Sequence, residues 1–186
     1  YVDPNRAAPY EADGSFARPY RTIQAAFDAI GSATNGAAYM NPTNRYYRVS
    51  VAPGTYVENL DVPYRPHLAL DLFSAVVVGN VTRTVPPMPC SDGPYTNMPS
   101  RLVIRGDSVR AFHPGSGDSV VGIDGDIVFG GCTSNAWIAS WHHLVELNDV
   151  GVTGEIRFDT GQLHWTHLVL NRACVGPIIC TNSWNG

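Results

Sequence analysis

The chain has 186 residues, of which 44% are hydrophobic and 15% are charged, so it can bury a core of ordinary size. Its twelve basic residues are all arginine, its formal net charge is −4, and no run of like charges occurs. A nucleic-acid groove or a charged membrane-binding face needs clustered basic residues, so neither partner is expected. The absence of lysine excludes a Schiff base, an amine nucleophile and a lysine general base.

Turn signals fill residues 1–19, where Asp3-Pro4, Asp13-Gly14 and Arg18-Pro19 oppose helix propagation. We expect an ordered but irregular arm here. Residues 20–31 follow with apolar side chains at the spacing i, i+3, i+4 and i+7, and Gly31 ends the run. This pattern predicts a short helix that buries one face. The four apolar positions are Ile23, Ala26, Phe27 and Ile30.

Residues 45–182 carry short apolar segments separated by turn residues, and no second helical pattern is present. The segment from Tyr47 to Val51 alternates and ends at the turn Ala52-Pro-Gly-Thr-Tyr56, after which apolar residues resume. Further strands are expected at 68–73, 76–81, 102–105, 127–129, 145–147, 150–152 and 169–170. The chain is therefore predicted to be all-β apart from one helix.

An internal repeat indicates how the strands are arranged. Trp141–Val145 recurs as Trp165–Val169, an offset of about 23 to 24 residues that is typical of solenoid coils. Such coils bury their apolar positions by stacking at roughly 4.8 Å, which predicts a parallel β-helix of about five to six coils. The other predicted equivalences are Leu147-Asn148 with Leu170-Asn171, Val152 with Val175, Ile156 with Ile179, Ile123 with Leu147, and Leu102–Ile104 one coil earlier.

Residues 84–100 contain five prolines and Cys90, so they are expected to project as a loop from a single domain spanning 1–186. The four cysteines are Cys90, Cys132, Cys174 and Cys180. They allow three pairings or free thiols, and the sequence does not choose among these states. Their spacing is not that of zinc ligands, and neither a metal nor a cofactor is expected.

The entry segment points to a family. Gly14-Ser-Phe16 with the segment Pro19–Ile30, followed by Val49–Tyr56 and Glu58, resembles the start of pectin-lyase-like right-handed parallel β-helix proteins. In that superfamily the helix caps the first coil and the Ala-Pro-Gly-Thr-Tyr turn forms its first corner. The superfamily includes lyases, hydrolases, esterases, phage tailspikes and non-catalytic surface proteins, so the resemblance implies a fold and not an activity.

One segment resembles an enzymatic motif of this superfamily. Asp124-Gly-Asp126-Ile-Val-Phe-Gly130 is similar to the carboxylate-bearing strand of pectin methylesterases, which implies Asp126 as nucleophile, assisted by Asp124 and Arg157. The chain departs from that family because it has only two glutamines, Gln24 and Gln162, and lacks the Arg-Pro-Trp signature. The alternative is that these aspartates are turn residues of a solenoid.

A polysaccharide lyase of this fold would need acidic residues for calcium and a basic residue that abstracts a proton beside a uronate. The candidates are Asp107, Asp118, Asp124, Asp126 and Asp149, with Arg105 as base. Their spacing does not force them onto one face. Solvated turn carboxylates are the alternative interpretation.

Sugar binding is a third hypothesis. The repeat makes His143 and His167 equivalent, beside Trp141 and Trp165, so the two histidines should stack on neighbouring coils. Histidine beside tryptophan could bind a sugar, ligate a metal or sense pH. A structural ladder of like residues is the alternative. Trp137, Trp184, His142 and His164 are further candidates of the same kinds.

The end of the chain supplies the leading functional hypothesis. After Ile178–Cys180 the sequence offers no amphipathic helix to cover the last coil, and an open strand edge pairs with something. We expect self-association or another protein at this coil. The chain is therefore interpreted as a non-enzymatic structural or attachment module, a virion component or a surface filament subunit. Because it begins at Tyr1 without an initiator methionine, a leader or a long apolar span, it is interpreted as the mature or trimmed form of an exported protein. Its expected location is extracellular or in a virion.

Overall fold

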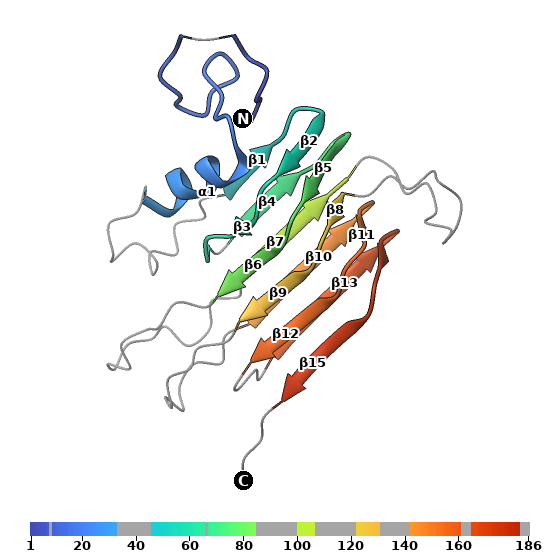
Figure 1. Cartoon of the computed structure of the whole chain (residues 1–186). Coiled ribbons are helices and arrows are strands. Elements are labelled where there is room, and N and C mark those ends of the chain that lie inside the picture. Colours follow the sequence, from blue (N-terminus) through green and yellow to red (C-terminus); the bar gives the residue numbers. More distant parts are fainter. Residues whose placement is uncertain are drawn as a thin grey trace, which may run out of the picture.

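The computed structural model describes residues 1–7, 9–32, 46–65, 67–84, 100–106, 122–130, 142–160 and 165–182. Within these ranges the chain is mostly strand, with one helix, α1 (Ile23–Ser32). The strands form three parallel sheets of five strands each. Figure 1 shows the strands stacked in one direction from the N-terminal part of the chain to its C-terminal part. The expectation of a strand-rich chain with one short helix is confirmed.

Sheet 1 has the order β1-β4-β7-β10-β13, sheet 2 the order β2-β5-β8-β11-β14 and sheet 3 the order β3-β6-β9-β12-β15. The strands of sheet 1 are β1 (Tyr46–Ser50), β4 (His67–Asp71), β7 (Ser100–Arg105), β10 (His142–Asn148) and β13 (Trp165–Asn171). Those of sheet 2 are β2 (Gly54–Val57), β5 (Ala75–Val78), β8 (Ile123–Asp124), β11 (Gly151–Val152) and β14 (Cys174–Val175). Those of sheet 3 are β3 (Leu60–Asp61), β6 (Val81–Thr84), β9 (Ile127–Gly130), β12 (Ile156–Thr160) and β15 (Ile178–Asn182).

Neighbouring strands within each sheet are three places apart in the chain, so the chain passes through sheets 1, 2 and 3 in turn. We call each passage a strand triplet, from β1–β3 to β13–β15. This order, with every strand pair parallel, is consistent with a parallel β-helix. Figure 1 shows α1 and the N-terminal arm at one end of the stack and β15 at the other.

The core consists of rows of apolar side chains that run across the sheets from triplet to triplet. In sheet 1 the register places Val49, Leu70, Ile104 and Leu147 in one row, each at most 2% exposed. Sheet 3 contributes a second row, in which the rings of Phe129 and Phe158 stack with centroids 5.0 Å apart. Alternate residues of each strand point inward, as the period of two requires.

Helix α1 covers the first triplet. Three of its four predicted apolar positions are buried, with Ile23 at 0%, Ala26 at 4% and Phe27 at 1% exposure, and Ile30 is partly buried. Glu58 accepts the backbone N–H groups of Ile23 and Gln24, each at 2.9 Å, and so caps the helix N-terminus.

The other end of α1 is held by an arginine. The Arg65 guanidinium donates to the carbonyl oxygens of Ile30 and Gly31 at 3.0 and 2.8 Å. A cation at this position complements the partial negative charge of a helix C-terminus. Both caps come from the connections on either side of β3, so the helix is fixed to the first triplet by charge as well as by packing.

A second arginine lies inside the core. Arg83 of β6 is 0% exposed, donates to the Arg65 carbonyl oxygen at 3.2 Å and lies 5.0 Å from the Tyr64 ring centroid. Burial lowers the pKa of Arg83 to about 10, which still leaves the guanidinium charged at neutral pH. The cap of α1 and the interior of β6 are thereby connected.

The N-terminal arm adds a further strand-like contact at this end. Val2 is fully buried, donates its N–H to the Ser50 carbonyl oxygen at 2.9 Å and accepts the Ala52 N–H at 2.8 Å. The arm is therefore joined to the first triplet by backbone hydrogen bonds, and its described residues contain no helix or strand.

Two predicted equivalences are wrong by one residue: that of Ile156 with Ile179, and that of Trp141–Val145 with Trp165–Val169, since Val145 pairs with Leu168. Leu147 and Val152 do pair with Leu170 and Val175, an offset of 23. Ile156, however, pairs with Ile178 and not with Ile179. The reason is a shorter corner, because three residues separate β11 from β12 whereas two separate β14 from β15.

The predicted step between Leu102–Ile104 and Ile123 is also wrong. Strand β7 pairs directly with β10, placing Ile104 beside Leu147, whereas Ile123 lies in sheet 2 beside Val152. The long connection between β7 and β8 makes this triplet longer than the 23 to 24 residues expected from the repeat, so the spacing could not be followed through it. The strand predicted at 76–81 is two strands, β5 and β6, which meet at a corner. The projecting loop predicted at 84–100 falls, except for its two end residues, outside the described residues.

Candidate functional site

Asp124 and Asp126 lie at the corner between sheets 2 and 3, at the end of β8 and just before β9. Asp124 Oδ1 accepts a hydrogen bond from the Thr153 hydroxyl at 2.7 Å. Asp126 Oδ1 accepts one from the Glu155 backbone N–H at 2.8 Å. Thr153 and Glu155 belong to the same corner of the next triplet, so both carboxylates connect successive triplets.

The Asp126 contact is one step of a longer ladder. Asn59 Oδ1 accepts the Asn80 backbone N–H at 2.8 Å, and Asn80 Oδ1 accepts the Asp126 backbone N–H at 3.0 Å. Each of these residues immediately precedes a strand of sheet 3. The ladder ends at Pro177, which occupies the same position before β15 and has no N–H to donate. We call Asn59, Asn80, Asp126 and Glu155 the corner ladder.

A column of glycines runs beside the corner ladder. A Cβ on Gly125 would lie 2.3 Å from the Gly79 carbonyl oxygen, and one on Gly154 would lie 2.5 Å from the Gly125 carbonyl oxygen. Gly176 continues the column at the last triplet. The backbones of successive corners therefore approach so closely that only glycine fits. The Gly-Asp sequence at 125–126 is explained by this packing.

Arg157 lies on β12, one triplet beyond the aspartates. Its guanidinium donates to Glu155 Oε2 at 2.9 Å. The pKa of Arg157 is raised above its usual value, first by this hydrogen bond, next by the charge of Asp159, and least by that of Asp126. The structure thus brings Arg157 within electrostatic range of Asp126, but its direct partner is Glu155.

The other residues of the enzymatic hypotheses are spread over the stack. Gln24 lies on α1 and exchanges hydrogen bonds with the backbone of Asp61, at the edge of β3. Arg105 and Asp149 lie at the corner between sheets 1 and 2, where Asp149 binds Arg172. The corner of Asp126 therefore contains neither Gln24 nor Arg105. Asp107, Asp118 and Gln162 lie outside the described residues.

The histidine pair predicted from the repeat is out of register. His143 pairs with Thr166, and His167 pairs with Leu144. Because a shift of one residue changes the face of a strand, the two histidines are not equivalent positions. Trp165 lies opposite His142 at the start of β13. Trp141, Trp137, Trp184 and His164 lie outside the described residues.

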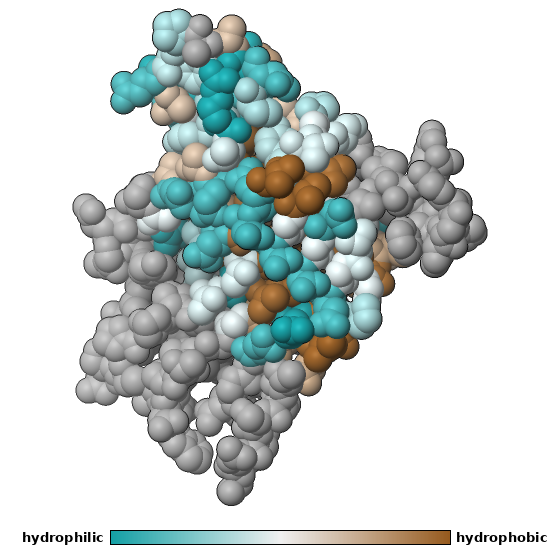
Figure 2. Space-filling view, viewed as in Figure 1, coloured by the Kyte–Doolittle hydropathy of each residue, from teal (hydrophilic) through white to brown (hydrophobic). Residues whose placement is uncertain are grey.

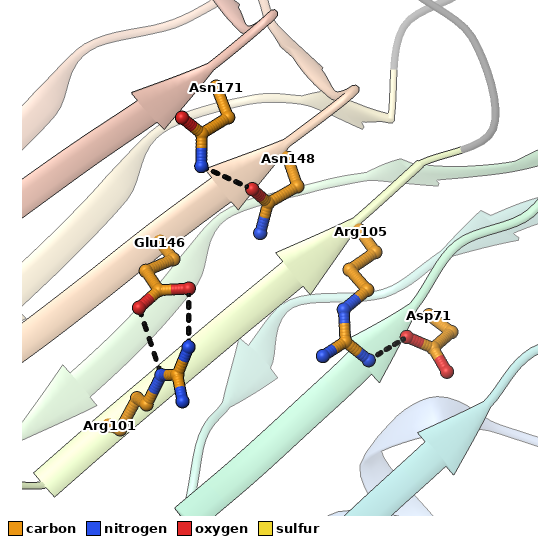
Figure 3. A network of polar contacts seen from close by, with 6 residues as sticks. All are labelled: Asp71, Arg101, Arg105, Glu146, Asn148 and Asn171. Carbon is orange, nitrogen blue, oxygen red and sulfur yellow. Dashed lines mark hydrogen bonds and ion pairs between the residues drawn. The ribbon is translucent and has the colours of Figure 1, made fainter.

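The outer face of sheet 1 carries a polar network, drawn in Figure 3. Arg101 donates to both carboxylate oxygens of Glu146, at 2.9 and 2.8 Å, across the β7–β10 pair. The hydrogen bonds to Glu146 raise the pKa of Arg101 above its usual value. Asn171 Nδ2 donates to Asn148 Oδ1 at 2.7 Å across β10 and β13. Side chains of adjacent triplets are thus bonded to one another over most of this sheet.

One member of the network is buried. Asp71 of β4 is 0% exposed and forms ion pairs with Arg105, at 3.3 Å, and with Arg48. Arg48 and Arg105 lie on the strands to either side of β4, so one carboxylate connects three strands. Two guanidinium groups around one buried carboxylate leave a net charge of +1 on this part of the face.

An aromatic pair lies beside this network. The Tyr46 and His67 rings are stacked with centroids 5.4 Å apart and an interplanar angle of 6°. Tyr46 is 55% exposed. His67 and Arg101 are neighbours in the register, and His167 occupies the same row further along the sheet. An exposed ring beside arginines offers both stacking and hydrogen bonding to a polar ligand.

Sequence reasoning missed the corner ladder. A signal was present, because a glycine precedes each ladder residue from Asn80 onward and an aliphatic residue follows it. The motif was obscured by its unequal spacing, since Gly79 and Gly125 are separated by a much longer segment than Gly154 and Gly176. The network on sheet 1 gave no sequence signal, because its members are far apart in the chain.

The exposure of the core rows increases sharply at the last triplet. Leu147 is 0% exposed whereas its neighbour Leu170 is 38% exposed, and Ile156 is 0% exposed whereas Ile178 is 48% exposed. Figure 2 shows brown apolar surface toward this end and a separate patch over β2 and β5, where Val57 is 80% exposed. The inner faces of β13 and β15 are therefore solvent-accessible.

Comparisons with protein-family models, with curated proteins and with solved structures found no match for the chain. Within the described ranges, no group of three or more histidine, cysteine, aspartate or glutamate residues could hold a metal ion. The same ranges contain no helix that is long and apolar enough to cross a membrane. Cys174 and Cys180, the two cysteines in the described part of the chain, are free thiols.

Proposed function

We propose that the chain is a right-handed parallel β-helix of the pectin-lyase-like type that serves as a rigid, non-catalytic structural or attachment module of an extracellular assembly. A virion component, such as a capsid decoration or tailspike-like part, or a surface filament subunit fits this proposal. One observation carries it: Asp124 and Asp126 serve as hydrogen-bond acceptors between triplets. Residues used in this way stabilise a stack, which is what a structural module requires.

The corner ladder supports the same conclusion through its composition. The side-chain amide oxygens of Asn59 and Asn80 each accept a backbone N–H from the next triplet. The Asp126 carboxylate makes the same kind of hydrogen bond. A nucleophile or a general acid would need the carboxylate chemistry of Asp126 itself. The ladder needs only an acceptor oxygen of the right reach, which asparagine also provides.

The rival proposal is a carbohydrate-active enzyme, an esterase or lyase that acts on an acidic polysaccharide with Asp126, Asp124 and Arg157 in its site. The test is turnover of methylated and unmethylated uronate polymers by the wild-type chain and by Asp126→Asn. We expect no turnover by either protein. Turnover by the wild-type chain, whether or not Asp126→Asn abolishes it, would contradict the non-catalytic proposal.

A second candidate function is passive carbohydrate binding on the outer face of sheet 1. The stacked and exposed Tyr46 supports it, together with arginines that carboxylates hold in fixed positions. Trp165 and His167, candidates from the sequence, belong to the same sheet. A glycan array would test this candidate with Tyr46→Ala, and Val57→Ala is the control for loss of an exposed apolar side chain. Glycan binding that survives Tyr46→Ala would exclude this face.

A further inference from the structure

The three last strands, β13, β14 and β15, each have a neighbouring strand on one side only within the described residues. The side chains that continue the core rows are exposed there, with Leu170 at 38% and Ile178 at 48%. Cys180, in the row of Phe129 and Phe158, is exposed as well. Open backbone edges and exposed core rows thus coincide on one end, which we call the β13–β15 end.

The β13–β15 end lacks the charges that usually protect an open strand edge. From Trp165 to Asn182 the sequence contains a single charged residue, Arg172, which donates to Asp149 Oδ2 at 2.6 Å. Natural edge strands avoid pairing by inward-pointing charges, exposed lysines or bulges. A nearly uncharged end can meet an identical end without like-charge repulsion, whereas a charged one could not.

The opposite end of the stack is partly covered. Helix α1 packs on the first triplet, Gln24 Oε1 accepts the Asp61 N–H at 2.7 Å, and Val2 bonds to Ser50 and Ala52. These contacts occupy backbone groups of β3 and at the end of β1 that would otherwise be open to strand pairing between copies. Pairing of the β13–β15 end with its own copy uses the same surface on both chains, so it gives a closed pair and not an open fibre.

We propose that the β13–β15 end binds the β13–β15 end of a second copy of this chain and forms a two-fold symmetric dimer with a continuous core. This inference rests on the proposed structural function and names the partner of the module. The two ideas fail separately, because polysaccharide turnover would overturn the function, whereas a monomer at every concentration would overturn the dimer.

Sedimentation velocity over a wide range of concentrations tests the proposal. We expect the wild-type chain to change from monomer to dimer without larger species. Ile178→Asp places a carboxylate of each copy at the shared surface and should weaken the dimer about a hundredfold or more. Val57→Asp, which adds the same charge at a more exposed valine near the covered end, should dimerise like the wild type. A filament, or equal weakening by both variants, would overturn the proposal.

A second measurement does not depend on any variant folding. The Cys180 thiol is exposed in the monomer and would be covered in the dimer. Its rate of alkylation by iodoacetamide, followed by peptide mass spectrometry, should fall about tenfold or more when the wild-type chain is concentrated from monomer to dimer. A Cys180 rate that is the same at both concentrations would overturn the proposal.

Discussion

At the corner between sheets 2 and 3, single side chains connect successive triplets by hydrogen bonds. Asp126 accepts the Glu155 N–H with one carboxylate oxygen, and Asn80 accepts the Asp126 N–H with its amide oxygen. An acidic residue and an amide thus perform the same task at equivalent positions. The chemistry that the contact requires is hydrogen-bond acceptance and not negative charge.

This equivalence predicts unequal effects of two substitutions. Asp126→Asn keeps the acceptor oxygen and should change the free energy of unfolding by less than about 0.5 kcal/mol. Asp126→Ala leaves the Glu155 N–H without its acceptor and should cost about 0.5–1.5 kcal/mol. Urea unfolding of the two variants and the wild type measures both values. Equal losses for the two variants would show that the charge, not the acceptor, is what matters.

Tyr56 gives the fold a pH dependence at high pH. Its hydroxyl donates to the Ala52 carbonyl oxygen at 2.8 Å, and burial, followed by the charge of Asp3, raises the pKa of Tyr56 to about 12. The unfolded chain releases this proton near pH 10, before the folded chain does. The contribution of Tyr56 is therefore intact below pH 10 and is lost as the pH rises from 10 to about 12.

Tyr56→Phe tests this assignment. At neutral pH the variant should be about 1 kcal/mol less stable than the wild type, because it lacks the hydrogen bond to Ala52. Above pH 10 the difference should shrink and then reverse, since the wild type loses about 1–3 kcal/mol by pH 12. Guanidinium unfolding of both proteins between pH 7 and 12 provides the comparison. A difference that stays constant over this range would refute the assignment.

The corners between sheets 2 and 3 in successive triplets pack so closely that their backbones are in contact. Gly125→Ala would place a Cβ 2.3 Å from the Gly79 carbonyl oxygen, so it should destabilise the chain by about 1–3 kcal/mol. Gly31→Ala is the matched control, since a Cβ there has nothing within 4 Å and lies in helix α1. The control should gain about 0.5–1 kcal/mol. Thermal unfolding monitored by circular dichroism distinguishes the two, and similar Tm values would contradict the packing account.

Elements with a local signal could be predicted from the sequence. The stripe of Ile23, Ala26, Phe27 and Ile30 predicted α1, because helical periodicity needs only neighbouring residues. Strands β1 and β2 are separated at residues 51–53, where the predicted turn Ala52–Tyr56 begins, but its residues from Gly54 onward already belong to β2. The caps of α1 by Glu58 and Arg65 were not predicted, because they are contacts between residues far apart in the chain.

Register could be predicted only where corners have equal lengths. Leu147 and Val152 were matched correctly to the next triplet, but Ile156 was not, since the corner before β15 is one residue shorter. The alignment of Trp141 with Trp165 placed His143 beside His167, whereas the inward row of Leu147 and Leu170 fixes an offset of 23. The register of β10 with β13 is decided by burial of the apolar rows and not by similarity between the two sequence segments.

The whole molecule has two unlike ends. At one end α1, Gln24 and Val2 cover the first triplet, and at the other the rows through Leu170 and Ile178 are exposed. Between the ends, the corner ladder and the network on sheet 1 connect each triplet to the next. A rigid stack with a helix over one end and the other end open is the form that a structural module joined through its open end would take.

Hydrogen exchange measured by mass spectrometry at two protein concentrations shows whether copies of the chain join through the β13–β15 end, because it reports on the two ends of the stack separately. Amides of β13–β15 should exchange faster than those of β4–β12 in dilute solution and become protected as the chain is concentrated. Amides of β1–β3, at the opposite end of the stack, should exchange at the same rate at both concentrations. Exchange of the β13–β15 amides that does not depend on concentration would show that this end is not an interface between copies.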